Sequence, residues 1–136
     1  MSSAKETALR EVGEMLTHVA SRLVAKVDSA AVQDGSDLYR PPAALRGDGA
    51  GIHTLDSAHD KAYTSTSFKN DTIALAEVSG IAALSKLPHV LFFAGGVVIK
   101  FGDEVMGAIG ASGAPGAKLD DNCARAGLER IRDRLK

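Results

Sequence analysis

The chain has 136 residues, which fits one domain and leaves no room for two independent hydrophobic cores. Its formal net charge of −1 supplies no basic field for phosphates, and only 4% of the residues are aromatic, so few rings could stack on bases. These values argue against a nucleic-acid partner. Hydrophobic residues make up 45% of the chain, enough for a core that Ala, Val, Leu and Ile must build because Trp is absent.

Signals for export or membrane insertion are missing from the sequence. Residues 1–6 place no apolar stretch behind a basic start, and no apolar run approaches the roughly 18 residues needed to cross a bilayer. The single cysteine, Cys123, cannot form an internal disulfide, so nothing points to an oxidising compartment. We therefore expect a cytoplasmic protein with no membrane partner.

The first element that the sequence predicts is an amphipathic helix near the N-terminus. Ser3 followed by Glu6 forms a capping box, in which each side chain satisfies a backbone N–H at the helix start. Apolar residues then recur at spacings of 3 and 4 and form one stripe: Leu9, Val12, Leu16, Val19 and Leu23. This stripe is expected to pack inward.

The next segment gives mixed signals. Val32 and Leu38 flank the turn pair Asp34-Gly35, which predicts a weak hairpin. Pro41-Pro42 interrupts it, because proline cannot donate a ladder hydrogen bond. The three glycines within residues 47–51 predict a shaped loop.

Two helices are expected in the middle of the chain. Thr54 or Asp56 can cap one that runs to about Phe68. Another is expected over residues 71–82, before Pro88 ends that region.

The last third of the sequence predicts strands and a final helix. Residues 90–93, 97–101 and 104–111 are apolar runs separated by short glycine-containing links, which favour antiparallel neighbours. The final helix is expected to begin at Asp120-Asp121 and to end in basic residues that match its dipole. The chain is thus predicted to be an α+β domain, with one antiparallel sheet built mainly from these strands and helices packed on it.

Three blocks of the sequence, taken in order, resemble the GlcG/HbpS-like family, which also supplies the C-terminal domain of PduO-type corrinoid adenosyltransferases. Arg46-Gly47-Asp48-Gly49-Ala50 is similar to the family's Arg-x-Asp-Gly-Ala loop, and Lys61-Ala62-Tyr63-Thr64 is similar to its Lys-Ala-x-Thr helix. The most specific block combines a Gly-Gly turn, a Gly-Ala-Ile-Gly strand and a helix with an acidic start: Gly95-Gly96, residues 107–113 and residues 120–124.

The resemblance covers residues 46–130 well and the N-terminal third poorly. It implies that residues 1–136 form a single profilin-like α+β sandwich that assembles into oligomers, with heme or a related tetrapyrrole as the ligand in several members. The sequence departs from the family's first hairpin, where residues 31–35 are a poor copy of its Val-Val-Asp-x-x-Gly turn and about three additional residues precede Arg46.

His18 is the candidate ligand of heme iron. It falls on a second face of the first helix, beside Met15 and Arg22. In some heme-binding relatives a histidine of this helix ligates the iron, and the resemblance gives His18 that role. Met15 could then lie against the macrocycle and Arg22 could pair with a propionate. The other interpretation is a solvated histidine on a polar helix face.

Arg46, Asp48 and Lys61 form a second group of candidates. In the structural interpretation, Arg46 pairs with Asp48 and Lys61 donates hydrogen bonds to loop carbonyls. In the functional interpretation, the two cations line an anion or carboxylate pocket, and a desolvated Lys61 acts as an acid or base with Asp48.

Two further features of the sequence bear on possible ligands and partners. The predicted strand 107–111 carries few large side chains, because Gly107 and Gly110 have none. A helix, a subunit or a flat ligand is therefore expected to pack closely against it. His53 and His59 are six residues apart and do not share a helical face, which argues against a zinc site formed by that pair.

Three functions stay open from the sequence, and the third of them is a purely structural assembly partner. The leading hypothesis is a heme-binding or heme-handling homo-oligomer, most simply a symmetric dimer or a multiple of one, with His18 as axial ligand. The alternative is an enzyme or binding module for a small carboxylate or carbonyl compound, which uses Arg46, Asp48 and Lys61 without a cofactor.

Overall fold

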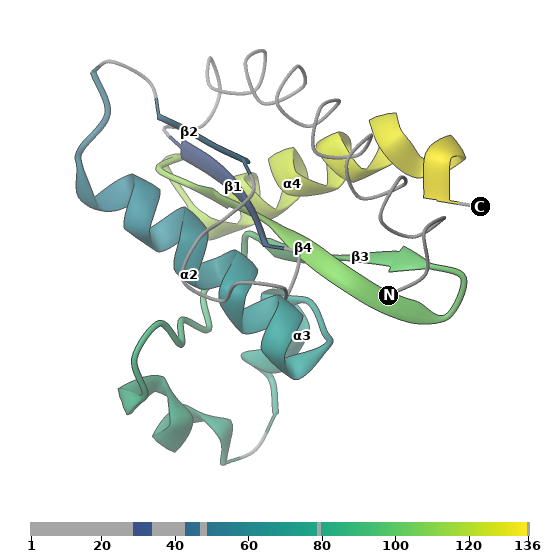
Figure 1. The fold of residues 1–136 in the computed structure, drawn as a ribbon. Helices are drawn as coiled ribbons and strands as arrows, with labels where there is room; N and C mark the ends of the chain where they lie inside the picture. The colour runs from purple at the N-terminus through teal and green to yellow at the C-terminus, as the bar shows by residue number, and fades with distance from the viewer. Residues whose placement is uncertain (1–28, 34–42, 47–48, 79, 136) are drawn as a thin grey trace.

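The computed structural model describes residues 29–33, 43–46, 49–78 and 80–135, and its described strands form one antiparallel sheet (Figure 1). The sheet has the order β2-β1-β4-β3, and its members are β1 (Ser29–Gln33), β2 (Ala43–Arg46), β3 (Gly96–Phe101) and β4 (Glu104–Ser112). Every neighbouring pair is antiparallel. The predicted α+β class and the antiparallel pairing of the last two strands are confirmed.

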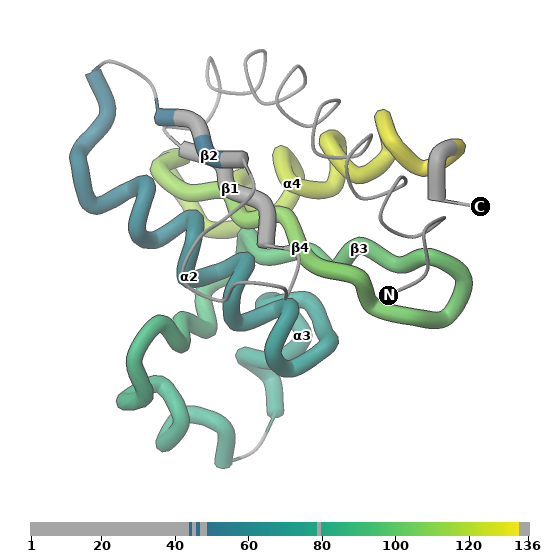
Figure 2. The backbone as a smooth tube through the Cα atoms, in the orientation of Figure 1, coloured from purple at the N-terminus to yellow at the C-terminus, as the bar shows by residue number. Residues whose placement is uncertain are grey.

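Within the described residues, two long helices cover the sheet, one on each face, as the ribbon and the tube both show (Figures 1 and 2). They are α2 (His53–Phe68) and α4 (Ala117–Ile131). Shorter helices connect them or follow them: α3 (Thr72–Leu75), η1 (Ile81–Lys86) and η2 (Arg132–Leu135). No helix in the described part of the chain is long and apolar enough to span a membrane.

The core between the sheet and α4 is aliphatic. Side chains on alternate positions of a strand point to opposite faces, so Val97 and Ile109, which pair across β3 and β4, face α4 together. The buried members of this core are Val97, Ile99, Ile109, Ala111, Ala124 and Ile131. Burial of these side chains holds α4 against the sheet.

On the other face of β4, Gly110 lets the backbone of α2 approach the sheet very closely. A Cβ atom at Gly110 would lie 2.9 Å from the backbone nitrogen of Ala62 and closer still to the carbonyl oxygen of Ala58. Both alanines are fully buried. The segment that packs closely against the strand at Gly110 is therefore α2 of the same chain. The sequence had left three such partners open: a helix, a subunit or a flat ligand.

The expected strand over residues 90–93 is wrong. Among the described residues this segment has no ladder partner, and its Leu91 N–H donates instead to Thr64 Oγ1 on α2 at 2.9 Å. The other strands of the sheet lie on the opposite side, where β1 pairs with β4 and with β2, and Val32 pairs with Ile109 and with Ala43. Leu38, the residue expected to pair near Val32, lies outside the described residues.

The expected single helix over residues 71–82 is also wrong. The chain forms α3, then a break, then η1. Gly80 lies at the break with φ 81, a left-handed conformation that glycine adopts without steric cost. The predicted helix that ends near Phe68 is confirmed, and α4 begins at Ala117, three residues before the predicted Asp120.

Candidate functional site

The residues singled out from the sequence fall into two sets. His18, Arg22 and Asp48 lie outside the described residues, so their roles stay predictions. Arg46 ends β2, is exposed, and its Nη1 donates a hydrogen bond to the carbonyl oxygen of Ala50 at 2.7 Å. This contact closes the glycine loop onto the strand.

Lys61 is buried on α2, with only 3% of its surface exposed. Its ammonium donates to the carbonyl oxygen of Ala111 and to Oδ2 of Asp120, both at 3.0 Å. The second carboxylate oxygen of Asp120 accepts from the Ala114 N–H at 2.9 Å. A buried charge needs such partners because it has left water. Lys61 therefore fastens α2 to the end of β4 and to the first turn of α4.

Gly95 leaves the space in which this ion pair sits. Its φ of 129 favours glycine, and a Cβ atom there would lie 3.0 Å from side-chain carbons of both Lys61 and Asp120. The Gly95 carbonyl accepts the Ala111 N–H at 2.9 Å. The Gly-Gly turn thus has a packing role beside a polar cluster.

A second polar cluster joins α3, β3 and α4. Arg125 donates from Nε to Asp121 at 2.7 Å and from Nη2 to Asp71 at 2.8 Å. The hydrogen bond to Asp121 is the largest of the effects that raise the pKa of Arg125 above its ordinary value, although partial burial opposes them. Asp71 also accepts the Val98 N–H at 2.9 Å. The start of α3 is thereby tied to the edge strand.

An open depression of about 580 Å³ lies beside this cluster, between β3 and α4. Its described lining combines apolar and cationic side chains with one carboxylate: Asp71, Val97, Val98, Lys100, Gly102, Arg125, Leu128 and Arg132. A volume of this size lies in the range of small-molecule sites, about 300–1,000 Å³. The mixture suits an amphipathic ligand with an apolar body and anionic groups.

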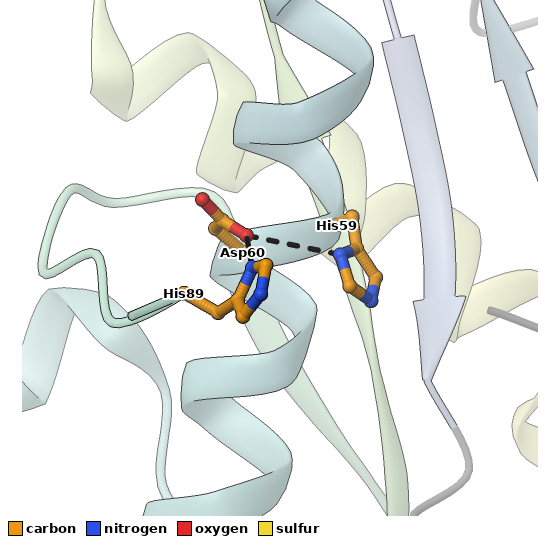
Figure 3. A group of neighbouring side chains, drawn as sticks. All are labelled: His59, Asp60 and His89. Carbon is orange, nitrogen blue, oxygen red and sulfur yellow. Dashed lines mark hydrogen bonds and ion pairs between the residues drawn. The ribbon is translucent and has the colours of Figure 1, made fainter. Parts of the chain in front are cut away.

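The third cluster contains His59, Asp60 and His89 (Figure 3). One carboxylate oxygen, Oδ1 of Asp60, lies 2.9 Å from Nδ1 of His89 and 3.7 Å from Nδ1 of His59. Tyr63 lies beside both imidazole rings, with centroid distances of 5.6 and 6.3 Å. Two histidines and a carboxylate are ligand types that zinc and related metals accept.

His89 is the member of this cluster that the sequence reasoning missed. It lies 29 residues from Asp60 in an irregular segment, so no spacing rule connects it to α2. His53, which does not share a helical face with His59, is outside the cluster. The second histidine of the cluster is His89, which comes from the segment before β3. The only sequence signal was a histidine beside Pro88, in a region that has to turn.

The fold and its polar clusters define a small α+β domain in which the antiparallel sheet lies between α2 and α4. A family model described as "Haem degrading protein HbpS-like" matches residues 5–129. The chain belongs to this HbpS-like family. No protein in the curated set matches it.

Solved structures agree with this family. A double mutant of Streptomyces reticuli HbpS is 33% identical, with a TM-score of 0.79 over 88% of this chain and 84% of that chain. Klebsiella pneumoniae protein ORFY is 20% identical, with a TM-score of 0.75 over 90% and 88% of the two chains. The PduOC:heme complex is also 20% identical, with a TM-score of 0.68 over 95% and 93%. The last two likenesses show the shared fold.

Proposed function

We propose that this protein binds heme and takes part in heme handling. The observation that carries the proposal is the HbpS-like family match over residues 5–129, because the family is described as heme-degrading and the matched range includes His18. A neighbour of the same fold forms a complex with heme. Heme, when bound, would supply an iron centre that binds dioxygen and changes oxidation state.

The described residues offer a fitting surface for the macrocycle in the depression between β3 and α4. Val98 and Leu128, which are partly exposed, supply apolar contacts for a flat ring, and Lys100 supplies a positive charge on β3 for a propionate. Arg125 adds a further cation, although the two aspartates to which it donates already offset part of its positive charge. The role of these residues is to bind and orient the ligand.

The iron ligand must come from elsewhere in the chain. The described residues that line the depression include no histidine, cysteine or methionine, and their one carboxylate, Asp71, is held by Arg125 and a backbone N–H. We therefore propose His18 as the axial ligand, with Arg22 as a partner of a propionate. An imidazole is a suitable ligand for heme iron.

Hemin titration of the purified protein tests this proposal. A saturable, sharp Soret band is expected for the wild type, and His18→Ala should shift or broaden it because the iron loses its imidazole. Arg22→Ala should weaken binding modestly, by about 0–1 kcal/mol for an exposed charge pair. His53→Ala is the matched control, since His53 is exposed on α2. Titration without saturation would contradict the proposal.

The depression has its own test. Lys100→Glu reverses a charge in its lining, whereas Lys118→Glu makes the same change in net charge on an exposed residue outside it. Lys100→Glu should weaken hemin affinity more than Lys118→Glu, because only the first places a carboxylate beside the propionates. If the two variants weaken hemin affinity equally, the depression is not part of the heme site.

The alternative function receives less support from the described contacts. A small-carboxylate site would use Arg46, Asp48 and Lys61, yet the ammonium of Lys61 is buried and already donates to Asp120 and to a backbone carbonyl. Arg46 donates to its own loop. We keep this function as the second proposal, which loss of activity with folding intact in Lys61 or Asp48 variants would support.

Assembly and location are proposals as well. We propose a cytoplasmic homo-oligomer, most simply a symmetric dimer or a multiple of one, in line with the assembly that the family resemblance implies. Light scattering at high micromolar concentration tests the assembly, and a monomer under those conditions would overturn it.

A further inference from the structure

We propose that His59, Asp60 and His89 form a binding site for one divalent first-row transition metal ion, such as Zn²⁺, separate from the proposed heme site. The three side chains come from α2 and from the irregular segment between η1 and β3. One ligand atom of each lies within 4.8 Å of the others. None of the three lines the depression between β3 and α4.

The distances suit a shared ion. Two ligand atoms about 2.1 Å from a metal, at the angles of tetrahedral or octahedral coordination, are about 3.0–3.4 Å apart. Oδ1 of Asp60 is 2.9 Å from Nδ1 of His89 and 3.7 Å from Nδ1 of His59, so these two separations bracket the required range. The ligand atoms of His59 and His89 lie within 4.8 Å of each other, so rotation of the two imidazole side chains would bring all three atoms onto one ion.

The segment that carries His89 is held in place before any ion binds. Thr64 on α2 donates its hydroxyl proton toward backbone carbonyls and accepts the Leu91 N–H at 2.9 Å. His89 itself has φ 65, so its backbone is fixed in a conformation that is uncommon for a residue other than glycine. Ligands that are already placed lose little freedom on binding.

A structural role explains only part of the arrangement. The contact between Asp60 and His89 would by itself fasten the segment to α2. It does not explain why His59 turns Nδ1 toward the same carboxylate oxygen, as Figure 3 shows.

The ligand set also selects the class of ion. Imidazole nitrogens suit Zn²⁺, Fe²⁺, Co²⁺, Ni²⁺ and Cu²⁺, whereas Mg²⁺ and Ca²⁺ prefer oxygen ligands alone. The ion can enter from solvent, because 39% of the His89 side chain is exposed. Three protein ligands leave at least one coordination position for water or another small ligand.

Calorimetric titration of the heme-free and metal-free protein with ZnCl₂ tests the site. The wild type should bind one Zn²⁺ per chain with a saturable isotherm. His89→Asn and His59→Gln should each weaken that binding at least about tenfold, since loss of outer partners alone costs 10–100-fold in metal sites. Asparagine is chosen at position 89 because it tolerates the left-handed backbone better than alanine. Co²⁺ should give visible d–d absorption that is absent in both variants.

His53→Gln is the matched control, because it removes an exposed imidazole from the first turn of the same helix and lies outside the cluster. It should leave Zn²⁺ affinity unchanged, and thermal melting without metal checks that each variant is folded. The hemin spectrum of His89→Asn should equal that of the wild type. Absence of a saturable isotherm, equal affinity in His89→Asn and wild type, or a hemin spectrum that changes with His89 would each overturn the proposal.

Discussion

Replacing Lys61 by methionine tests the central polar contact of the fold. Methionine keeps most of the buried volume of lysine but removes its charge and its hydrogen-bond donors. Two groups then lose a partner: the carboxylate of Asp120, a residue that is 4% exposed, and the carbonyl of Ala111. Removal of one member of a buried ion pair costs about 3–5 kcal/mol, because it leaves an uncompensated charge in the interior.

The expected loss is a large share of the stability of a small domain, about 5–15 kcal/mol. Urea unfolding followed by circular dichroism measures it as a lower midpoint at an unchanged slope. Lys118→Met is the control, because Lys118 is exposed and its replacement should stay within about 0.5 kcal/mol of the wild type.

A second substitution separates charge from packing. Asp120→Asn in the Lys61→Met background removes the unpaired charge, and its amide oxygen can still accept the Ala114 N–H. This double variant should recover at least about 1 kcal/mol relative to Lys61→Met, because a neutral amide is cheaper to bury than a carboxylate. A loss below about 1 kcal/mol in Lys61→Met, or no recovery in the double variant, would refute the structural role of Lys61.

Two further substitutions test the packing of the sheet against its helices. Gly110→Ala should destabilise by about 1–3 kcal/mol or more in urea unfolding, because its Cβ would overlap the α2 backbone, whereas Gly116→Ala, which has open space around it, should be close to neutral. A neutral Gly110→Ala would contradict the close approach. Thr72→Val should cost about 1–3 kcal/mol, since the buried Gly96 N–H loses its acceptor at 2.9 Å; thermal melting within error of the wild type would contradict this.

The elements that sequence patterns predicted well are those with local signals. The helix 53–68 and the antiparallel β3–β4 hairpin follow from local apolar runs and a short glycine-containing link. The predicted cap of that helix was wrong, because Ile52 is the N-cap without a side-chain hydrogen bond, and Thr54 and Asp56 lie inside the helix. The predicted strand 90–93 failed because an apolar run does not reveal whether its N–H groups find a ladder or a threonine side chain of a distant helix. Such a choice is decided by tertiary contacts.

Side-chain partners were harder to predict than elements. Lys61 was expected to donate to backbone carbonyls, and one of its acceptors is a carbonyl, but its ion pair with Asp120 spans 59 residues. Asp120 was predicted to begin the last helix, because a negative charge at a helix start is stabilised by the helix dipole. Its carboxylate lies in the first turn of α4, where it accepts from the Ala114 N–H and pairs with Lys61. Partners so far apart in sequence follow only from the topology.

The two proposed sites can fail independently because of how α2 sits in the fold. The side of α2 that bears Ala58 and Ala62 is buried against the sheet, while His59 and Asp60 extend toward the segment that carries His89. The depression proposed for heme lies beside α4 and β3 and shares no described residue with this cluster. A variant at His89 should therefore leave hemin binding intact, and a variant at Lys100 should leave Zn²⁺ binding intact. If either change affects both ligands, the two sites are coupled through α2 or the sheet, and the assignment of separate sites is wrong.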